Sequence, residues 1–358
     1  MKVDEQALPH PRMYEGSGVT DVALHVDAPT VPRGGPYPRA RHFKEPVEII
    51  PDVYLGPLGK VGEAVMDACT ARGENTPIPV RQYGARYALY RTNAPRDPLF
   101  TWDPDRRLRH VLQLSRIVRP HSIGTGRAAR VIAPGEGGRR TIIPAWGRLD
   151  QKAYVVDEEA NWIRDEDIGP IRELIDAFDP QSLPERVKRA MWHYEYAASV
   201  YWVDLRWTLL VTALESLIHT DERALPRKKQ AGANTQFIGR LLTLAGRVPG
   251  LELDPEDLAA MYELRSGLAH GQSLPGGMSP GTRDLYLHME SALRSILITA
   301  IRDPAVAALF ASDSVVREEL PPSRYELARR SKQPRPSDPA EPGEPDPHPG
   351  GGSASQVP

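Results

Sequence analysis

The chain has 358 residues, about twice the length of a typical domain, so its length predicts two domains. Its 45 Lys and Arg residues and 47 Asp and Glu residues give a net charge of −2, which argues against a wholly basic nucleic-acid coat and against a polyanionic protein. A single cysteine, Cys69, excludes an intramolecular disulfide framework and any zinc site that needs several thiolates.

The N-terminal residues contain no apolar segment of the kind found in a secretory signal peptide. The longest apolar stretch, residues 207–218, contains Glu215 and is too short to cross a bilayer. We therefore expect a soluble, cytoplasmic protein that does not enter a membrane.

Residues 1–165 hold several short runs rich in Val, Ile or Tyr, each bounded by Pro or Gly, a pattern typical of short strands between turns. The runs are residues 22–26, 47–50, 78–91, 109–119, 129–133 and 153–156. One helix is predicted near residues 59–71. We predict a mixed, β-rich N-terminal domain that serves as a sensor or recognition domain.

Residues 166–311 have apolar residues at helical spacing and predict an all-α bundle of about five helices. One of these helices has clear ends. Asp254 is placed to cap it, Pro255 suits its first position, and Gly271 suits the position after its last turn. The predicted fold class is therefore α+β, with a β-rich domain followed by a helical bundle.

Residues 312–358 are expected to be a linker and a disordered, Pro-rich tail. From residue 331 onward the chain has eight Pro, four Gly and no aromatic residue. Such a segment buries too little apolar surface to offset its chain entropy.

The charges are segregated along the N-terminal domain. Between Arg81 and Arg148 there are fourteen Arg and only four acidic residues, with Tyr and Trp interleaved. Arg side chains bind phosphate groups. Aromatic rings stack on bases. The segment could therefore contact nucleic acid or another anion. The alternative is that these Arg residues pair with the acidic segments on either side, and the sequence leaves both open.

Familiar catalytic motifs are absent. No phosphate-binding loop, dinucleotide fingerprint, nucleophile elbow or zincin motif occurs, and the ten histidines form no His-x3-His pair beside a carboxylate. The sequence therefore indicates neither a cofactor nor a metal site.

The segment from Met261 to Gly271 carries the most informative pair of residues, Arg265 and His270, at the end of one helix. At about 100° per residue their Cα vectors differ by roughly 140°, which a long Arg side chain can bridge. Arg can stabilise charge on a phosphorane and His can move protons near neutral pH, so the pair suits phosphodiester cleavage without metal. An Arg and a His at a helix end can also be purely structural.

This segment, together with Ala213-Leu-Glu-Ser-Leu217 on an upstream helix, resembles HEPN domains of the Apea-like branch, whose motif is R-x4-6-H near the end of a late helix. The resemblance covers about residues 183–303. It implies a metal-independent ribonuclease fold that forms a homodimer through the helical bundle, with the two motifs facing each other across the two-fold axis.

The resemblance also implies a role for each matching residue. Arg265 corresponds to the phosphate stabiliser and His270 to the acid and base, while Glu215 corresponds to the helix Glu that supports the motif Arg. Glu215 lies on an otherwise apolar helix and needs a partner, for which Arg265 is the candidate. Ser266 stands where many active members carry Asn, Asp or His, and it can donate a hydrogen bond but does not titrate usefully.

The leading hypothesis is an endoribonuclease that cleaves RNA by attack of the 2′-hydroxyl, as a toxin or anti-phage defence effector. Its N-terminal domain would sense a trigger ligand or a phage component. The alternative is a non-catalytic HEPN module for nucleotide or RNA binding and dimerisation. Six aromatic residues crowd two adjacent helices, and they serve either core or dimer packing or base stacking: Trp192, Tyr194, Tyr196, Tyr201, Trp202 and Trp207.

Overall fold

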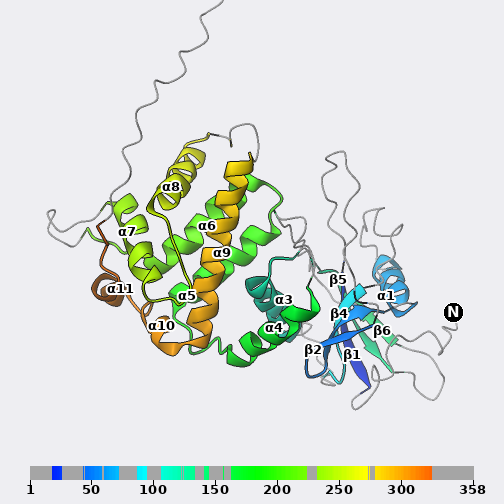
Figure 1. Cartoon of the computed structure of the whole chain (residues 1–358). Coiled ribbons are helices and arrows are strands. Elements are labelled where there is room, and N and C mark those ends of the chain that lie inside the picture. The colour runs from blue at the N-terminus through cyan, green and yellow to red at the C-terminus, as the bar shows by residue number, and fades with distance from the viewer. Residues whose placement is uncertain are drawn as a thin grey trace, which may run out of the picture.

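The structure, a computed structural model, places a β-sheet at one end of the molecule and a group of helices at the other (Figure 1). It describes residues 18–25, 43, 45–58, 60–71, 87–94, 106–121, 123, 125–133, 141–144, 156, 163–223, 232–272, 274 and 279–324. Within them the chain is a mixed α+β protein, as the sequence predicts.

The sheet has six antiparallel strands in the order β2-β3-β4-β1-β5-β6. The strand β1 (Val19–His25) lies in its centre, between strands that follow it by more than sixty residues. The other strands are β2 (Val47–Ile50), β3 (Val53–Pro57), β4 (Tyr87–Arg91), β5 (Thr125–Ile132) and β6 (Thr141–Pro144).

Four of the predicted strands overlap β1, β2, β4 and β5, whereas β3 and β6 are not among the predicted strands. Residues 78–86 and 153–155 lie outside the described residues. The strand β3 follows β2 after a two-residue turn in which Asp52 has a φ of 67°. The sequence signal for β3 is weak because the strand ends in Gly56 and Pro57, residues that strands usually avoid.

Both faces of the sheet are buried, since successive side chains point to opposite faces. On β1, Val22 packs toward the helix α1 (Lys60–Ala71), while the neighbouring Ala23 packs toward the helix α3 (Arg106–Val118). On β4, Tyr90 likewise packs toward α1, and the neighbouring Leu89 packs toward α3. The sheet is therefore a middle layer between two helical layers.

The prediction of a strand over residues 109–119 is wrong, because this segment is the helix α3. Its buried residues Leu108, Val111, Leu112 and Ser115 recur at three- and four-residue spacing, which is the helical period. The Leu, Ile and Val content of the segment hid this period, since a short apolar run does not distinguish a strand from a buried helix.

In the described part of the chain, eight further helices follow from residue 165 onward, where the sequence predicts about five, and the last of them lies in the segment predicted as a linker. They are α4 (Asp165–Ala177), α5 (Glu185–Ser199), α6 (Val203–Ile218), α7 (Ala233–Ala245), α8 (Pro255–Ala269), α9 (Pro280–Arg302), α10 (Pro304–Ala308) and α11 (Asp313–Glu319). The long helix α9 packs on α4, α5, α6, α8 and α10. The bundle core includes the fully buried rings of Trp207, Tyr194, Tyr286 and Phe237.

The helix α3 joins the sheet to the bundle, because it contributes residues to the cores of both. Its last carbonyl groups accept hydrogen bonds from bundle side chains. Tyr194 Oη donates to the carbonyl of Arg116 at 3.0 Å, and Arg294 Nη1 donates to that of Val118 at 2.8 Å. These donors satisfy carbonyls that a helix end otherwise leaves without a partner.

The prediction of a bare linker from residue 312 is wrong for α11, because Val316 and Leu320 belong to the bundle core. The predicted disordered tail at residues 331–358 lies outside the described residues. Among the helices that the structure describes, none combines the length and the apolar character needed to span a membrane.

Candidate functional site

The helix α8 carries Arg265, Ser266 and His270, and its ends are fixed by local sequence. Asp254 caps the first turn by accepting a hydrogen bond from the Glu256 backbone N–H at 3.1 Å, as predicted. At the other end Gly271 has a φ of +85°, and the Gln272 N–H donates to the Gly267 carbonyl at 3.0 Å. This is a Schellman arrangement, in which a glycine adopts the left-handed conformation that closes the helix.

Arg265 pairs with Glu215, which confirms the partner expected for this carboxylate. Arg265 Nη2 lies 3.0 Å from Glu215 Oε2, and the two side chains are 29 % and 19 % exposed. The residues come from α8 and α6, fifty positions apart in the chain. The pair is therefore reachable from solvent while the guanidinium is held in one place.

Tyr262, one turn before Arg265 on α8, borders this pair. The Arg265 Cζ atom lies 6.0 Å from the centroid of the Tyr262 ring, and that ring lies 5.1 Å from the ring of Phe237. Burial raises the pKa of the Tyr262 hydroxyl, and the Glu215 carboxylate raises it further, while Arg265 partly offsets both. The phenol therefore stays neutral and serves as an aromatic wall for the guanidinium.

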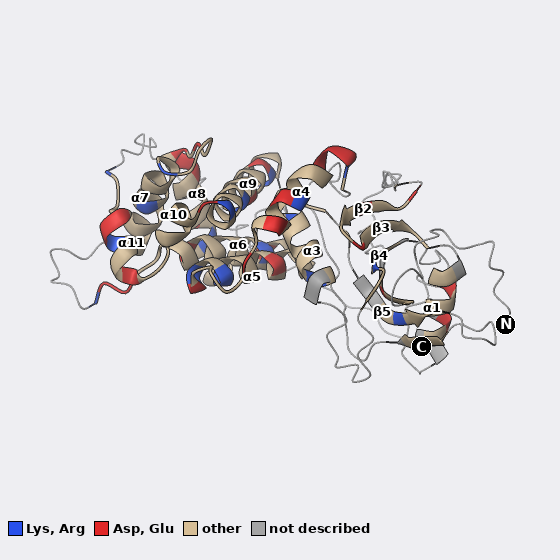
Figure 2. Ribbon diagram, turned by 90° about the horizontal axis from the view of Figure 1, so that it is seen from below, with Lys and Arg blue, Asp and Glu red and all other residues tan. Residues whose placement is uncertain are grey.

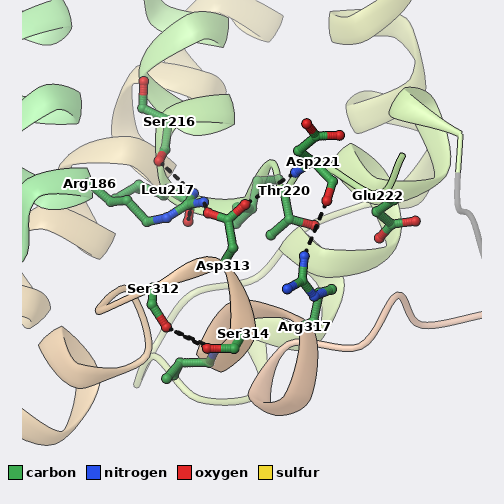
Figure 3. Close-up of polar contacts among 12 residues, drawn as sticks. Arg186, Ser216, Leu217, Thr220, Asp221, Glu222, Ser312, Asp313, Ser314 and Arg317 are labelled. Atoms are coloured by element: carbon green, nitrogen blue, oxygen red, sulfur yellow. Dashed lines mark hydrogen bonds and ion pairs between the residues drawn. The ribbon is translucent and has the colours of Figure 1, made fainter. Parts of the chain in front are cut away.

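Two contacts fix the position of α6, and hence of Glu215. The buried indole Nε1 of Trp207 donates to the carbonyl of Met261 at 3.3 Å, which joins α6 to α8. At the end of α6, Arg186 Nη1 donates to the carbonyls of Ser216 and Leu217 at 3.1 and 3.2 Å (Figure 3). The Arg186 guanidinium thus caps the turn that carries Glu215.

Arg186 also connects this turn to α11. Its Nη2 forms an ion pair with Asp313, whose Oδ2 accepts a hydrogen bond from the Asp221 N–H at 3.2 Å (Figure 3). Burial opposes ionisation of Asp313, but these hydrogen bonds outweigh it and hold the pKa of the carboxyl below its usual range. Sequence reasoning did not identify Arg186 as a brace, because its partners are distant in the chain.

His270 is the C-cap residue of α8 and its side chain is exposed. Its backbone N–H donates to the carbonyls of Ser266 and Gly267. Within residues 232–272, no hydrogen bond or ion pair joins the side chains of Arg265 and His270. One chain therefore places both residues on the last turns of α8 without a hydrogen bond between their side chains.

Ser266 is half-buried beside Arg265 on α8. Adjacent residues of a helix point about 100° apart, so Ser266 does not share the helix face of Arg265. The Arg265 Nη2 is occupied by Glu215, and its Nε is buried without a hydrogen-bond partner in the described chain. The end of α8 offers a positioned cation and an exposed imidazole, groups that can bind a phosphate and move a proton.

A second pair, Ser115 and His121, was not anticipated from the sequence. Ser115 Oγ lies 2.8 Å from His121 Nε2, and both side chains are buried. The Ile123 N–H donates to His121 Nδ1 and Ser115 Oγ donates to the Leu112 carbonyl, so Nε2 carries the proton and donates to the serine. A histidine that activates a serine must accept the hydroxyl proton, whereas here Nε2 donates to the serine. The pair is therefore a structural hydrogen bond at the end of α3 and not a nucleophile with its base.

The Arg-rich segment between Arg81 and Arg148 is used in part for internal ion pairs. Arg130 pairs with Asp21 in a bidentate contact across β5 and β1, with distances of 2.7 and 2.9 Å. Arg116 pairs with Glu195, and Arg119 Nε lies 3.5 Å from Asp167. The partners of Arg130 and Arg119 lie in the flanking acidic segments, as the pairing interpretation expects, whereas the partner of Arg116 lies on α5 of the bundle.

In Figure 2, Lys and Arg alternate with Asp and Glu over the described helices. Groups of three or more His, Cys, Asp or Glu side chains that could hold a metal ion do not occur among the described residues. Comparison with protein-family models, with curated proteins and with solved structures finds no match to this chain.

Proposed function

We propose that this chain is a metal-independent, HEPN-type endoribonuclease that acts in the cytoplasm and cuts RNA with Arg265 and His270. The observation that carries the proposal is the ion pair of Arg265 with Glu215. It holds a guanidinium on the same helix end that exposes His270, and it leaves the pair open to solvent.

The reaction needs only protein groups and the RNA itself. The 2′-oxygen attacks the adjacent phosphorus while the bond from phosphorus to the 5′-oxygen breaks. An imidazole accepts the proton of the 2′-hydroxyl, and an imidazolium returns a proton to the leaving 5′-oxygen. Arg265 stabilises the charge that develops on the non-bridging oxygens. The products are a 2′,3′-cyclic phosphate and a 5′-hydroxyl.

A homodimer through the helical bundle would complete this site. Arg265 and His270 of one chain are not hydrogen-bonded to each other, and one imidazole cannot be base and acid in the same step. Two copies related by a two-fold axis bring two Arg and two His residues to one cleft. One His270 then serves as base and the other as acid.

In this proposal the N-terminal region receives a trigger ligand or phage component and controls the bundle. The helix α3 is a suitable connection, because its core residues belong to both parts of the molecule. The proposed role as a toxin or anti-phage effector rests on analogy with Apea-like HEPN proteins.

The test is cleavage of a labelled single-stranded RNA in the presence of EDTA. The wild type is expected to leave 2′,3′-cyclic phosphate ends, and a substrate with 2′-deoxyribose at the cut positions is expected to stay intact. Arg265→Ala should lower the rate by at least about a hundredfold, and Arg265→Lys by less, since Lys keeps the charge but not the planar fork. Equal cleavage by the wild type and Arg265→Ala would overturn the proposal.

A second candidate function is a non-catalytic module for RNA or nucleotide binding and dimerisation. It is favoured by the engagement of Arg265 Nη2 with Glu215, which gives the Arg a structural task. The same assay separates the two candidates. A wild type that binds RNA and leaves it intact at every trigger tested would support the module.

A further inference from the structure

The exposed large apolar side chains of the described residues come from one short segment of the chain. They lie on the second half of α5, on the connection to α6 and on the first turn of α6. We call them the α5–α6 aromatic patch: Trp192, Tyr196, Tyr201, Trp202 and Leu205. Trp202 is the most exposed at 71 %. A concentrated exposed patch of this kind marks an interaction surface.

Two rings of the patch form a ready stacking surface. Trp192 and Tyr196 are four residues apart on α5, so both lie on the same helix face. Their ring centroids are 5.7 Å apart and their planes differ by only 4°. The side chains are 59 % and 49 % exposed. A flat base can add to this stack without reordering the rings, which lowers the entropic cost of binding.

Cations precede this pair on the same helix. Lys188 and Arg189 lie about one turn before Trp192, and Arg189 is exposed. Arg189 lies three residues before Trp192 on α5, a spacing that places its charge near the aromatic residues. The nearby Glu195 is paired with Arg116, so its charge is already compensated. The surroundings of the two rings are therefore favourable for phosphate groups.

One side of α6 leads from Leu205, the last residue of the patch, to Glu215 of the candidate site. Thr208, Thr212 and Glu215 are partly exposed and follow Leu205 at intervals of three or four residues, which places them along one side of the helix. Ten residues of α-helix span about 15 Å. About four nucleotides cover this distance even at the helical spacing of about 3.4 Å each.

We propose that the α5–α6 aromatic patch binds single-stranded RNA, with bases stacked on Trp192 and Tyr196 and phosphates held by Lys188 and Arg189. The inference rests on the proposed function, since it supplies the binding surface that leads the substrate to Arg265. A second copy of the chain fits this face less well. An isologous contact centred on Trp192 would bring the Lys188 and Arg189 cations of both copies close together, because they lie about one turn from it, and like charges in an interface are costly.

The test uses full-length His270→Ala protein, so that bound RNA is not cleaved. The probe is fluorescein-labelled oligouridylate of about 12 nucleotides, alone or annealed to oligoadenylate, and binding is followed by fluorescence anisotropy. Adding Trp192→Ala and Tyr196→Ala should weaken single-strand binding by at least about tenfold. Trp192→Phe keeps an aromatic face and should stay within about threefold. Binding of the duplex, whose bases are already stacked, should not change.

The salt dependence of RNA binding tests the role of the cations separately. Arg189→Gln should reduce the slope of log affinity against log salt by about 0.7, the value for one phosphate contact on a single strand. Arg302→Gln is the matched control, because Arg302 is an exposed cation on α9 that pairs with Glu173. This control should leave the slope unchanged.

Three results would overturn the inference. The first is that the His270→Ala parent does not bind the oligouridylate. The second is that the added Trp192→Ala and Tyr196→Ala changes leave the affinity unchanged. The third is that these two changes convert a dimer to a monomer while the RNA affinity per chain stays the same. The last result, seen by light scattering, would identify the patch as an interface between copies. Failure of the proposed function is a separate outcome, since it is read from cleavage in EDTA and not from binding.

Discussion

Arg265 Nη2 donates a hydrogen bond to Glu215 Oε2 over 3.0 Å, joining the ends of α8 and α6. The Arg265 Nε is buried and has no hydrogen-bond partner among the described residues. Glu215 therefore holds the guanidinium by one edge only. This geometry makes Glu215 a positioning residue in the proposed reaction, while Arg265 is the group that meets the phosphate.

Replacing Glu215 by Gln should separate positioning from stability. The amide keeps the shape but loses the charge, so the guanidinium is held less firmly and cleavage should fall by about tenfold. The free energy of unfolding should change by less than about 1 kcal/mol, because the ion pair is partly exposed.

The two quantities are measured by single-turnover cleavage and urea unfolding. Asp257→Asn is the matched control, since it removes the exposed contact of Asp257 with His288 on neighbouring helices and should alter neither quantity. A loss of activity in Glu215→Gln that follows a loss of stability of several kcal/mol would contradict a positioning role.

Gly271→Ala tests the end of α8. At a φ of +85°, an alanine side chain is strained by about 1 kcal/mol, so the variant should unfold at a lower urea concentration. Cleavage should fall more than stability does, because the adjacent His270 shifts with the helix end. Gly281→Ala is the control: a Cβ there meets nothing within 4 Å in the first turn of α9, so the variant should be as stable as the wild type or slightly more stable.

The α8 helix also shows how much of the site the sequence can predict. Asp254, Pro255 and Gly271 mark its ends through local backbone chemistry, and the structure has the helix between them. The pairing of Glu215 with Arg265 was predictable because a carboxylate on an apolar helix requires a partner.

Other features depend on long-range contacts, which the sequence does not reveal. The helix α3 has apolar residues that fit either a strand or a buried helix, and only its packing between the sheet and the bundle decides. Arg186 looks like a surface cation, yet it caps α6 and pairs with Asp313 more than a hundred residues away. Exposure of Trp192 and burial of Trp207 likewise follow from tertiary packing.

The buried ion pair of Arg240 and Glu222 should dominate the stability of the connection after α6. Arg240 Nη2 lies 2.7 Å from Glu222 Oε1, and Nη1 donates to the Ile218 carbonyl, to Thr220 and to Gln236. Arg240→Met removes four hydrogen bonds to buried acceptors, including the ion pair with Glu222. The free energy of unfolding should fall by about 3–5 kcal/mol.

Arg223→Met is the matched control for this prediction. Arg223 pairs with Asp221 in the same connection, but the arginine side chain is 90 % exposed. The control should leave the urea midpoint unchanged. Similar midpoints for the two variants would show that burial does not set the strength of the Arg240 contacts.

The contact between Arg186 and Asp313 should weaken in acid. The pKa of Asp313 is lowered in the folded protein, so its ionised form stabilises the fold above the ordinary carboxyl pKa, and this contribution is lost as the pH falls through the folded value. Asp313→Asn lacks the charge at every pH. The stability difference from the wild type should therefore be present at neutral pH, at about 1 kcal/mol or less, and vanish in strong acid. A difference that is constant with pH would contradict this account.

The most direct test of the central claim is the rate of RNA cleavage in EDTA by His270→Ala beside His219→Ala. Both histidines are exposed C-cap residues of bundle helices, so the two changes disturb the fold alike. The account predicts that His219→Ala cleaves at the wild-type rate and that His270→Ala is slower by at least about a hundredfold. Cleavage at one rate by the wild type and both variants would contradict it.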